Sequence, residues 1–590
     1  MTESRIRAKK SISIVAILIV LISIAVSPWN LLDAINIPKL FLLCSLAFIL
    51  SLSVNFNRYF YKKFKSRDTY IFLLSFFVIA LLISTFFSRT NILNNWFGVQ
   101  GRLTGFITFS ALFVICSWIY IYTNPNDNYK FIFALGASGF ISNVYYIFQY
   151  FGLDFTKWER VYGASSSVLG NPNFVTALAS VSFFAGISFF DSQFFKQDST
   201  NNKKSKSNTQ LLSILIGLAI SLSSIFAISL NPSQQGFITI AFVSPFWALL
   251  VLRARLANRK KLLFFGIFSA LFVVIIYFAT AQTALSSLAD FFQANFAPRI
   301  IYWTTSLFIF IHFPLFGVGM NGIFDYFREY RSAELANQLN VGLDVGSNTS
   351  HNLPIEFLVG GGIVVFVLYI SLQFLVVVGY FKKRGQHSLF EKNLLTIWFA
   401  IQFQSLINPQ PITLLMWNFI FGAILAAGNP IKDAVVGEKE SRREAPIVSK
   451  KLTREKKHLF MYIVSILSAF SLVSSGLLLK ADNQFRRAIE SSDLYAIYDK
   501  SQAYPTNGNR ILYAAKIMCL NGRPKEAATL VKNGMGDYPR DFELIRFALT
   551  IEEPESVRKS IANKIMKLDP QNPDLTMESL LKTEMNCGKN

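Results

Sequence analysis

The sequence predicts an all-α protein that crosses a membrane many times and ends in a small helical-repeat domain. Hydrophobic residues make up 52% of its 590 residues and charged residues only 16%, a balance typical of chains that fold in lipid. Apolar runs long enough to cross a bilayer alternate with short basic clusters. After the last of these runs the chain becomes polar and takes on the spacing of a helical repeat.

The apolar runs supply the candidate membrane spans, and the first of them, which follows a basic start, is interpreted as a retained span. They begin near Ser11, Leu40, Tyr70, Thr104, Phe131, Phe174, Leu211, Phe237, Leu262, Ile301, Ile355, Asn393, Ile412 and Leu459. These runs are nearly free of charged residues, whereas the connections between them are basic on alternate sides. The charge of the connections therefore indicates which runs cross.

One apolar run, Ile301–Val318, breaks the charge pattern if it crosses. It would place the basic turn Lys382–Arg384 and the basic stretch 432–457 outside, against the positive-inside rule. If this run lies along the outer surface instead, both clusters return to the cytoplasm, and about twelve spans plus a further span at Leu459–Leu479 remain. The stretch Leu285–Pro354 then becomes one large outer loop, and long ordered loops are usually functional.

The predicted organisation has four segments. Residues 1–430 form the membrane domain, 431–457 a basic cytoplasmic linker, 458–479 the last transmembrane helix and 480–590 an extracytoplasmic domain. In the extracytoplasmic domain a pair of Tyr-Pro dipeptides, at 504–505 and 538–539, stand 34 residues apart, which is the tetratricopeptide period. The sequence therefore predicts two or three helical hairpins there.

Charge and cysteine content argue against several classes of protein. The net charge of +22 is spread over basic clusters next to apolar runs, where lipid headgroups explain it better than nucleic acid does. The four cysteines contain no CxxC pair, so they predict neither a metal site nor a disulfide framework. The predicted outer loops of the membrane domain contain no DxD pair and no His/Cys cluster, which disfavours a metal-dependent mechanism. The absence of a P-loop and of GxSxG argues against ATP hydrolysis and serine hydrolysis.

Among the four histidines, His351 is the candidate general base. It lies on the predicted outer side at the mouth of a span, whereas His387 and His458 fall in predicted cytoplasmic segments and His312 in the interfacial run. The alternative is that His351 only caps the following helix or lies among lipid headgroups. The residue type and the place agree with either role.

Several arginines lie on the predicted outer side, against the topological bias. They are Arg160, Arg299, Arg328 and Arg331. A bound phosphate is one reason for such placement, because the guanidinium fork matches phosphate oxygens and stays charged. For Arg328 and Arg331 the sequence favours the alternative that they form a solvated helix face with nearby glutamates.

Residues 162–173 form a second polar cluster on the predicted outer side. Small residues there let a backbone approach a ligand, and Asn171 is placed to cap a helix that starts at Pro172. A structural turn and an anion cradle both fit this composition. The similar segment Asn231–Gly236 is interpreted as a turn.

A series of motifs in a fixed order runs from about Asn91 to Ala427. In order they are Trp96–Gly105, Gly170–Asn173, Arg299–Trp303, Pro314–Gly319, Ser350–Asn352, Glu356 and Gly360–Ile363. This ordered set resembles the O-antigen ligase and polymerase superfamily, some members of which also carry a helical-repeat tail.

The resemblance implies a GT-C-like glycosyltransferase in the cytoplasmic (inner) membrane, acting on its outer side. Such an enzyme moves a glycan from an undecaprenyl-pyrophosphate donor to an acceptor, with inversion and with neither metal nor cofactor. By motif match, Arg299 and Arg160 would hold the donor pyrophosphate, and His351 would activate the acceptor hydroxyl.

The same resemblance implies that Arg102, Asn171 and Asn173 contribute to substrate binding. One position departs from the family pattern. An acidic residue often stands shortly before the family histidine, whereas here Asp344 stands seven residues before His351. The spacing of Asp344 therefore differs from that of the family.

Two classes of function remain open at the level of sequence. The first is a glycan ligase acting on the lipid A core or another surface acceptor, with a polysaccharide polymerase or a protein O-oligosaccharyltransferase as alternatives. Its partners would be the lipid-linked donor, a glycan, lipid or protein acceptor, membrane lipids and a protein bound by the repeats, but no nucleic acid. The second class is a transporter of lipid-linked glycans, which should carry ionisable residues within its spans.

Overall fold

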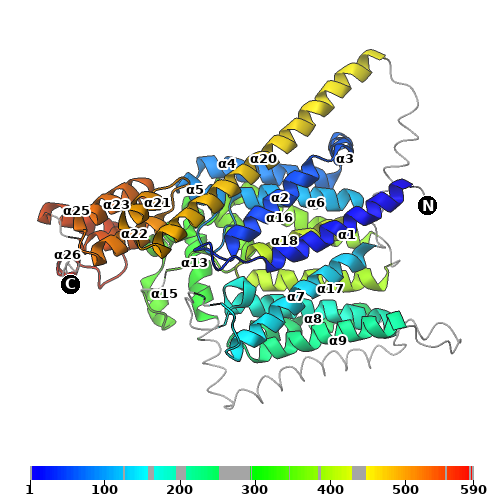
Figure 1. Cartoon of the computed structure of the whole chain (residues 1–590), viewed down its shortest axis with the longest axis horizontal. Helices are drawn as coiled ribbons and strands as arrows, with labels where there is room; N and C mark the ends of the chain where they lie inside the picture. The colour runs from blue at the N-terminus through cyan, green and yellow to red at the C-terminus, as the bar shows by residue number, and fades with distance from the viewer. Residues whose placement is uncertain are drawn as a thin grey trace.

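The structure is a computed structural model that contains only helices and loops in the residues it describes (Figure 1). It describes residues 3–123, 127–156, 158, 165–194, 208–251, 293, 296–343, 346–382, 387–427, 447–551, 554–583 and 587. The prediction of an all-α polytopic membrane protein is confirmed.

The membrane domain is built from helices that follow one another through short connections. The first group is α1 (Glu3–Ile24), α2 (Asn36–Ser51), α3 (Val54–Lys65), α4 (Thr69–Phe87), α5 (Ile92–Phe97), α6 (Phe106–Tyr122), α7 (Asn128–Tyr150), α8 (Pro172–Phe194), α9 (Asn208–Ser229) and α10 (Gln235–Val251). The second group is α13 (Ala297–His312), α14 (Ile323–Tyr330), α15 (Ala333–Gln338), α16 (Leu353–Phe381), α17 (Leu389–Ile407) and α18 (Ile412–Ala426).

Every predicted apolar run that falls on described residues is a helix. Among the described residues six helices are long and apolar enough to cross a membrane, namely α4, α7, α8, α9, α16 and α20 (Ile447–Glu490). The shorter apolar helices are the later portion of α1, together with α2, α6, α10 and α18. The predicted run near Leu262 lies outside the described residues.

The bundle has two distinct ends. The N-terminus and the basic helix α3, which ends in Lys62, Lys63 and Lys65, lie at one end (Figure 1). The helices that follow α20 lie at the opposite end, and we call that end of the bundle the tail end (Figure 1). The long helix α20 runs the length of the bundle and connects the two.

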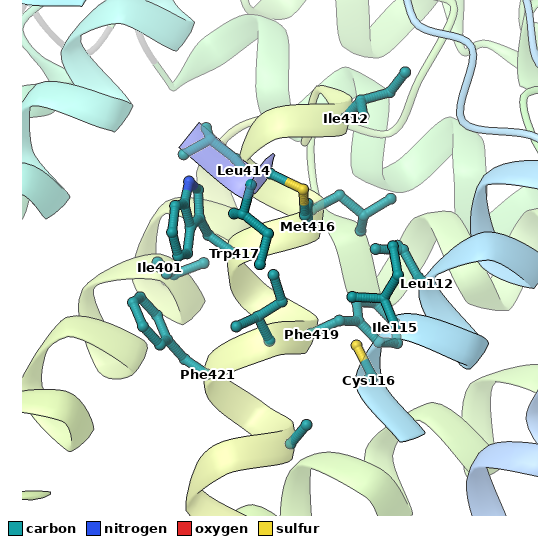
Figure 2. Packing of buried hydrophobic residues seen from close by; sticks show 14 of the residues in the cluster. Leu112, Ile115, Cys116, Ile401, Ile412, Leu414, Met416, Trp417, Phe419 and Phe421 are labelled. Atoms are coloured by element: carbon teal, nitrogen blue, oxygen red, sulfur yellow. The ribbon is translucent and has the colours of Figure 1, made fainter. Parts of the chain in front are cut away.

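Helix α18 forms the centre of the bundle. Every residue from Ile412 to Leu425 is buried, and the Trp417 side chain is fully enclosed. Figure 2 shows side chains of α18 directed toward Leu112 and Ile115 of α6 on one side and toward Ile401 of α17 on the other. A predominantly apolar helix such as this one suits the centre of a bundle.

Helix α13 runs across the direction of the bundle helices rather than along it (Figure 1). Arg299 near its start donates from Nε to the Ile407 carbonyl at the end of α17, and His312 at its end contacts Tyr330 of α14. Both ends of α13 thus lie at the tail end. The position of this run along the outer surface of the membrane stays a prediction.

The segment after α13 is anchored to a break in α16. Gly362 has a φ of 75°, which interrupts the helix, and the amide of its neighbour Ile363 donates to the Pro314 carbonyl. The amides of Val318 and Gly319 donate to the Val359 and Gly360 carbonyls, each at 2.9 Å. The broken helix therefore offers backbone groups that hold the segment 314–319 in place.

The helices after α20 pack in sequence around a hydrophobic core of their own. They are α21 (Leu494–Ser501), α22 (Gly508–Leu520), α23 (Pro524–Asp537), α24 (Phe542–Ala548), α25 (Glu555–Leu568) and α26 (Met577–Leu581), and we call them the tail. Their assignment to the tetratricopeptide class and the four domain boundaries stay predictions.

The expectation that the cysteines form no disulfide framework is wrong for one pair. Cys519 at the end of α22 and Cys587 after α26 form a disulfide with a Cα to Cα distance of 4.7 Å. Because 68 positions separate the two residues, no local spacing pattern could indicate the pair. Cys44 and Cys116 are free and buried in the membrane domain.

Candidate active site

A cavity of about 600 Å³ opens at the tail end of the bundle. Residues of the segments 28–36, 100–102, 169–174 and 346–351 line it, together with Trp158, Tyr302, Phe324, Pro409 and Arg486. Its wall therefore combines loops that are hundreds of residues apart in the sequence. Several of the predicted site residues face this one space.

A tight loop between α5 and α6 brings Arg102 to the cavity. Gly98 and Gly101 have φ angles of 91° and 85°, and a Cβ on Gly105 would lie 2.3 Å from the Gly98 amide nitrogen. Only glycine allows this close return of the backbone. The Gly101 amide donates to the Asp33 carboxylate at 2.9 Å, which fixes the loop against the segment before α2. Arg102 is buried in consequence.

The segment before α8 forms another wall of the cavity. Asn171 accepts a hydrogen bond from the Asn173 amide at 2.8 Å and so caps α8, as the sequence predicts. The buried Lys39 of α2 donates to the Val168 carbonyl, which ties this segment to the bundle. Asn171 and Asn173 both line the cavity, close to the first turn of α8.

The loop that carries His351 is organised by a buried carboxylate. Glu356 Oε2 accepts hydrogen bonds from Thr349 Oγ1 at 2.6 Å, from the Ser350 amide at 3.0 Å and from Ser350 Oγ at 3.1 Å. Asn352 caps α16 by accepting from the Ile355 amide. With both sides fixed, His351 takes a φ of 53°, a left-handed conformation that a non-glycine residue adopts only when its surroundings enforce it.

The environment of His351 favours the neutral imidazole. Burial, then the charge of Arg102 and the charge of Arg299, lower the pKa of His351 well below the ordinary value of 6.5. The ring stacks on Tyr302 of α13 with 4.8 Å between centroids. Its Nδ1 atom is buried and makes no hydrogen bond within the described portion of the protein. A neutral, oriented imidazole is able to accept a proton.

The predicted site residues divide into three groups. His351, Arg102, Asn171 and Asn173 line the same cavity. Arg299 is not among the residues that line the cavity. Its Nε donates to the Ile407 carbonyl at 2.8 Å, but its charge still lowers the pKa of His351, so it lies close to the site. Arg160 and Asp344 lie outside the described residues.

The expectation for Arg328 and Arg331 is wrong, because they do not form a solvated helix face. Arg331 is 1% exposed and donates to both carboxylate oxygens of Asp569 at 2.7 Å. Arg328 pairs with Glu543 at 3.2 Å and lies over the Phe542 ring. These arginines dock the tail onto α14, so they need no phosphate to balance their charge.

Four residues that matter at this site were not identified from the sequence as chemically important: Asp33, Lys39, Glu356 and Arg486. Glu356 stands in a recognised motif, but nothing in the sequence shows that its carboxylate holds the loop of His351. Asp33 and Lys39 are ionisable residues beside an apolar run, which is a usable signal of function in a membrane protein. Arg486 of α20 gives no such signal.

Comparison with known proteins bears on the same region. Residues 218–370 match a family model described as O-antigen ligase. This part of the chain is similar to the O-antigen ligase family. No curated protein matches the chain.

The O-antigen ligase match runs from the later portion of α9 into α16 and includes Arg299, His351, Glu356 and the break at Gly362. It stops short of Arg102 and of the Asn171 segment, which the fold brings to the same cavity. The match supports a membrane protein of the ligase or polymerase type in general terms.

Proposed function

We propose that this protein transfers a glycan from an undecaprenyl-pyrophosphate donor to an acceptor hydroxyl, on the outer side of the cytoplasmic membrane and with inversion. One observation carries the proposal. A neutral, half-buried His351 and Arg102 line one cavity, with the charge of Arg299 beside them. A base for the acceptor and positive charge for the leaving group are the two requirements of the reaction.

The reaction follows from that arrangement. The acceptor oxygen attacks the anomeric carbon while the bond from this carbon to the pyrophosphate oxygen breaks, and the pyrophosphate leaves with the bonding electron pair. His351 takes the acceptor proton, and Arg102 and Arg299 stabilise the charge that develops on the leaving group. Because pyrophosphate is a good leaving group, binding and orientation supply most of the catalysis and the proposal needs no metal.

The orientation in the membrane rests on charge and on the tail. The basic helix α3 lies at the end of the bundle opposite the cavity, and by the positive-inside rule this supports an outer position of the cavity. The disulfide between Cys519 and Cys587 supports the same side, because disulfides persist in oxidising compartments.

The acceptor is proposed to be the lipid A core or another surface glycan, as for a ligase. A polysaccharide polymerase and a protein O-oligosaccharyltransferase would use the same cavity and the same donor. Deletion of the gene separates them, because a glycan-modified lipid, a long polymer or a modified protein would be the product that disappears.

The proposal is tested with His351→Ala and Arg299→Ala in cells that display the glycan, at matched protein levels. We expect a fall in transfer by at least about a hundredfold for His351→Ala, because general base catalysis contributes that much. Continued attachment or extension of glycan by both variants would refute the proposed mechanism. Accumulation of lipid-linked glycan on the inner leaflet would indicate transport instead.

A further inference from the structure

The outer end of α20 belongs to the wall of the cavity. Asp482 accepts a hydrogen bond from the Leu32 amide at 2.7 Å, and Asn483 donates to the Asn30 carbonyl at 3.1 Å. Leu32 also packs against the hydrophobic core of the tail. The segment before α2, which lines the cavity, is therefore held in place by the helix that leads into the tail.

One turn beyond these contacts α20 places Arg486 on the cavity wall. Its side chain is 23% exposed, and its Nε donates to Glu490 Oε1 at 2.9 Å on the same helix. The next residue, Arg487, points elsewhere and is exposed to solvent. The register of α20 therefore brings the side chain of Arg486, and not that of Arg487, to the cavity.

The described wall of the cavity carries charged groups of both signs. Among the described residues its carboxylate is that of Asp33, which accepts from the Asn36 amide, the Asn36 side chain and the Gly101 amide. Arg102 and Arg486 add two positive charges to the same wall. Glu490 balances part of the charge of Arg486, yet a guanidinium group on a concave wall still offers several N–H donors suited to an anionic oxygen.

We propose that Arg486 is an anion-binding residue of the active-site cavity, so that the helix leading into the tail contributes directly to substrate binding. The group it binds is an anionic oxygen of the substrate, supplied by the donor phosphate or by a carboxylate on the glycan. This inference rests on the proposed function, because that function brings such a substrate into the cavity. Arg486 lies outside the residues that match the O-antigen ligase family.

The test uses full-length protein reconstituted in liposomes with the lipid-linked glycan from the same membranes. For Arg486→Gln we expect the donor KM to rise about tenfold with kcat within about twofold, because a charge-assisted hydrogen bond is lost while His351 stays in place. Arg486→Lys should recover some of the affinity, since the charge remains. Arg487→Gln is the matched control and should leave the KM unchanged.

A second variant separates binding from a structural role. Glu490→Gln removes the ion pair within α20 but keeps the guanidinium, so the donor KM should not rise. If Glu490→Gln raises the KM as much as Arg486→Gln does, the ion pair only supports the helix and the inference is overturned. An unchanged KM in Arg486→Gln overturns it as well.

Two inhibitors, inorganic pyrophosphate and glucuronate, distinguish whether Arg486 binds the donor phosphate or a carboxylate of the glycan. A rise of about tenfold in the pyrophosphate inhibition constant of Arg486→Gln assigns the residue to the donor phosphate, and the same rise for glucuronate alone assigns it to a carboxylate of the glycan. If neither constant changes, the inference fails. Activity of His351→Ala in the same assay would instead refute the proposed function.

Discussion

At the scale of single residues, the site depends on how its charges act on one another. Burial lowers the pKa of His351 most, and the charges of Arg102 and Arg299 each lower it further. The same guanidinium groups that would stabilise the pyrophosphate therefore keep the base unprotonated at neutral pH. Binding and proton transfer are coupled through this cluster.

The coupling predicts the behaviour of Arg102→Gln. Loss of the positive charge raises the pKa of His351 toward its ordinary value, so protonation inactivates the base at a higher pH. The acid limb of the kcat profile should therefore move to higher pH, and kcat/KM at neutral pH should fall about tenfold or more. The pH profile of glycan transfer measures this shift. A limb that stays at the pH of the wild type would contradict it, and Arg487→Gln serves as the control.

The hydrogen bonds of Glu356 predict a second effect, which concerns the position of His351 rather than its protonation. In Glu356→Gln the charge-assisted hydrogen bonds to Thr349 and Ser350 weaken, and the loop that holds His351 loosens. We expect kcat to fall about ten- to a hundredfold, with a smaller change in donor KM.

Single-turnover transfer measures the effect of Glu356→Gln on the chemical step. The same change in Glu391, which completes a capping box with Ser388 at the start of α17, is the control. Glu391→Gln should cost about 1 kcal/mol or less and leave transfer unchanged. Equal losses of transfer in both variants would show a general loss of fold instead.

At the scale of elements, breaks and tight loops place the site. Helix α16 would run on as one apolar span if Gly362 did not interrupt it, and the segment 314–319 would then lose the backbone groups to which it is bound. A Cβ on Gly362 would lie 2.1 Å from the Leu315 carbonyl oxygen. The break therefore fixes the path of the outer segment after α13.

This geometry predicts a large effect of Gly362→Ala. The variant should lose roughly 2 kcal/mol or more, because it combines a backbone clash with an unfavourable φ. Gly152 has a similar φ of 77° but no heavy atom within 4 Å of a Cβ, so Gly152→Ala should cost only about 1 kcal/mol. Thermal unfolding in detergent compares the two, and equal losses would contradict the role given to the clash.

At the scale of the whole molecule, the tail and the membrane domain are joined by ion pairs, one of which is buried. Arg331 and Asp569 are both nearly inaccessible, and Arg540 of the tail pairs with Glu329 of α14. Phe324, also on α14, lines the cavity. Docking of the tail therefore helps to hold one wall of the site.

Arg331→Gln should release this contact. The variant leaves the Asp569 carboxylate buried without its main partner, at a cost of about 3 to 5 kcal/mol. We expect faster hydrogen exchange in α14 and α25 and a loss of transfer. Lys559→Gln breaks an exposed ion pair with Glu555 on α25. This control should change the free energy of unfolding by no more than about 0.5 kcal/mol and should leave hydrogen exchange in α14 and glycan transfer unchanged. Unchanged exchange in Arg331→Gln would show that other contacts hold the tail.

The sequence by itself determined the class of the protein and much of the site. Apolar runs and basic clusters are local signals, so they indicate the helices of the bundle and the unusual run that becomes α13. The sequence also indicates His351, Arg299 and the Asn171 segment as candidate site residues. Each of them is polar or charged and lies next to an apolar run.

Only the tertiary structure decided which of these groups meet. It brought Arg102 and Arg486 to the cavity of His351 and turned Arg331 toward Asp569, at distances in sequence that leave no periodic pattern. It also paired Cys519 with Cys587. Contacts of this kind arise from the packing of whole helices and from the need to satisfy buried charge, which depend on the complete fold rather than on any local segment.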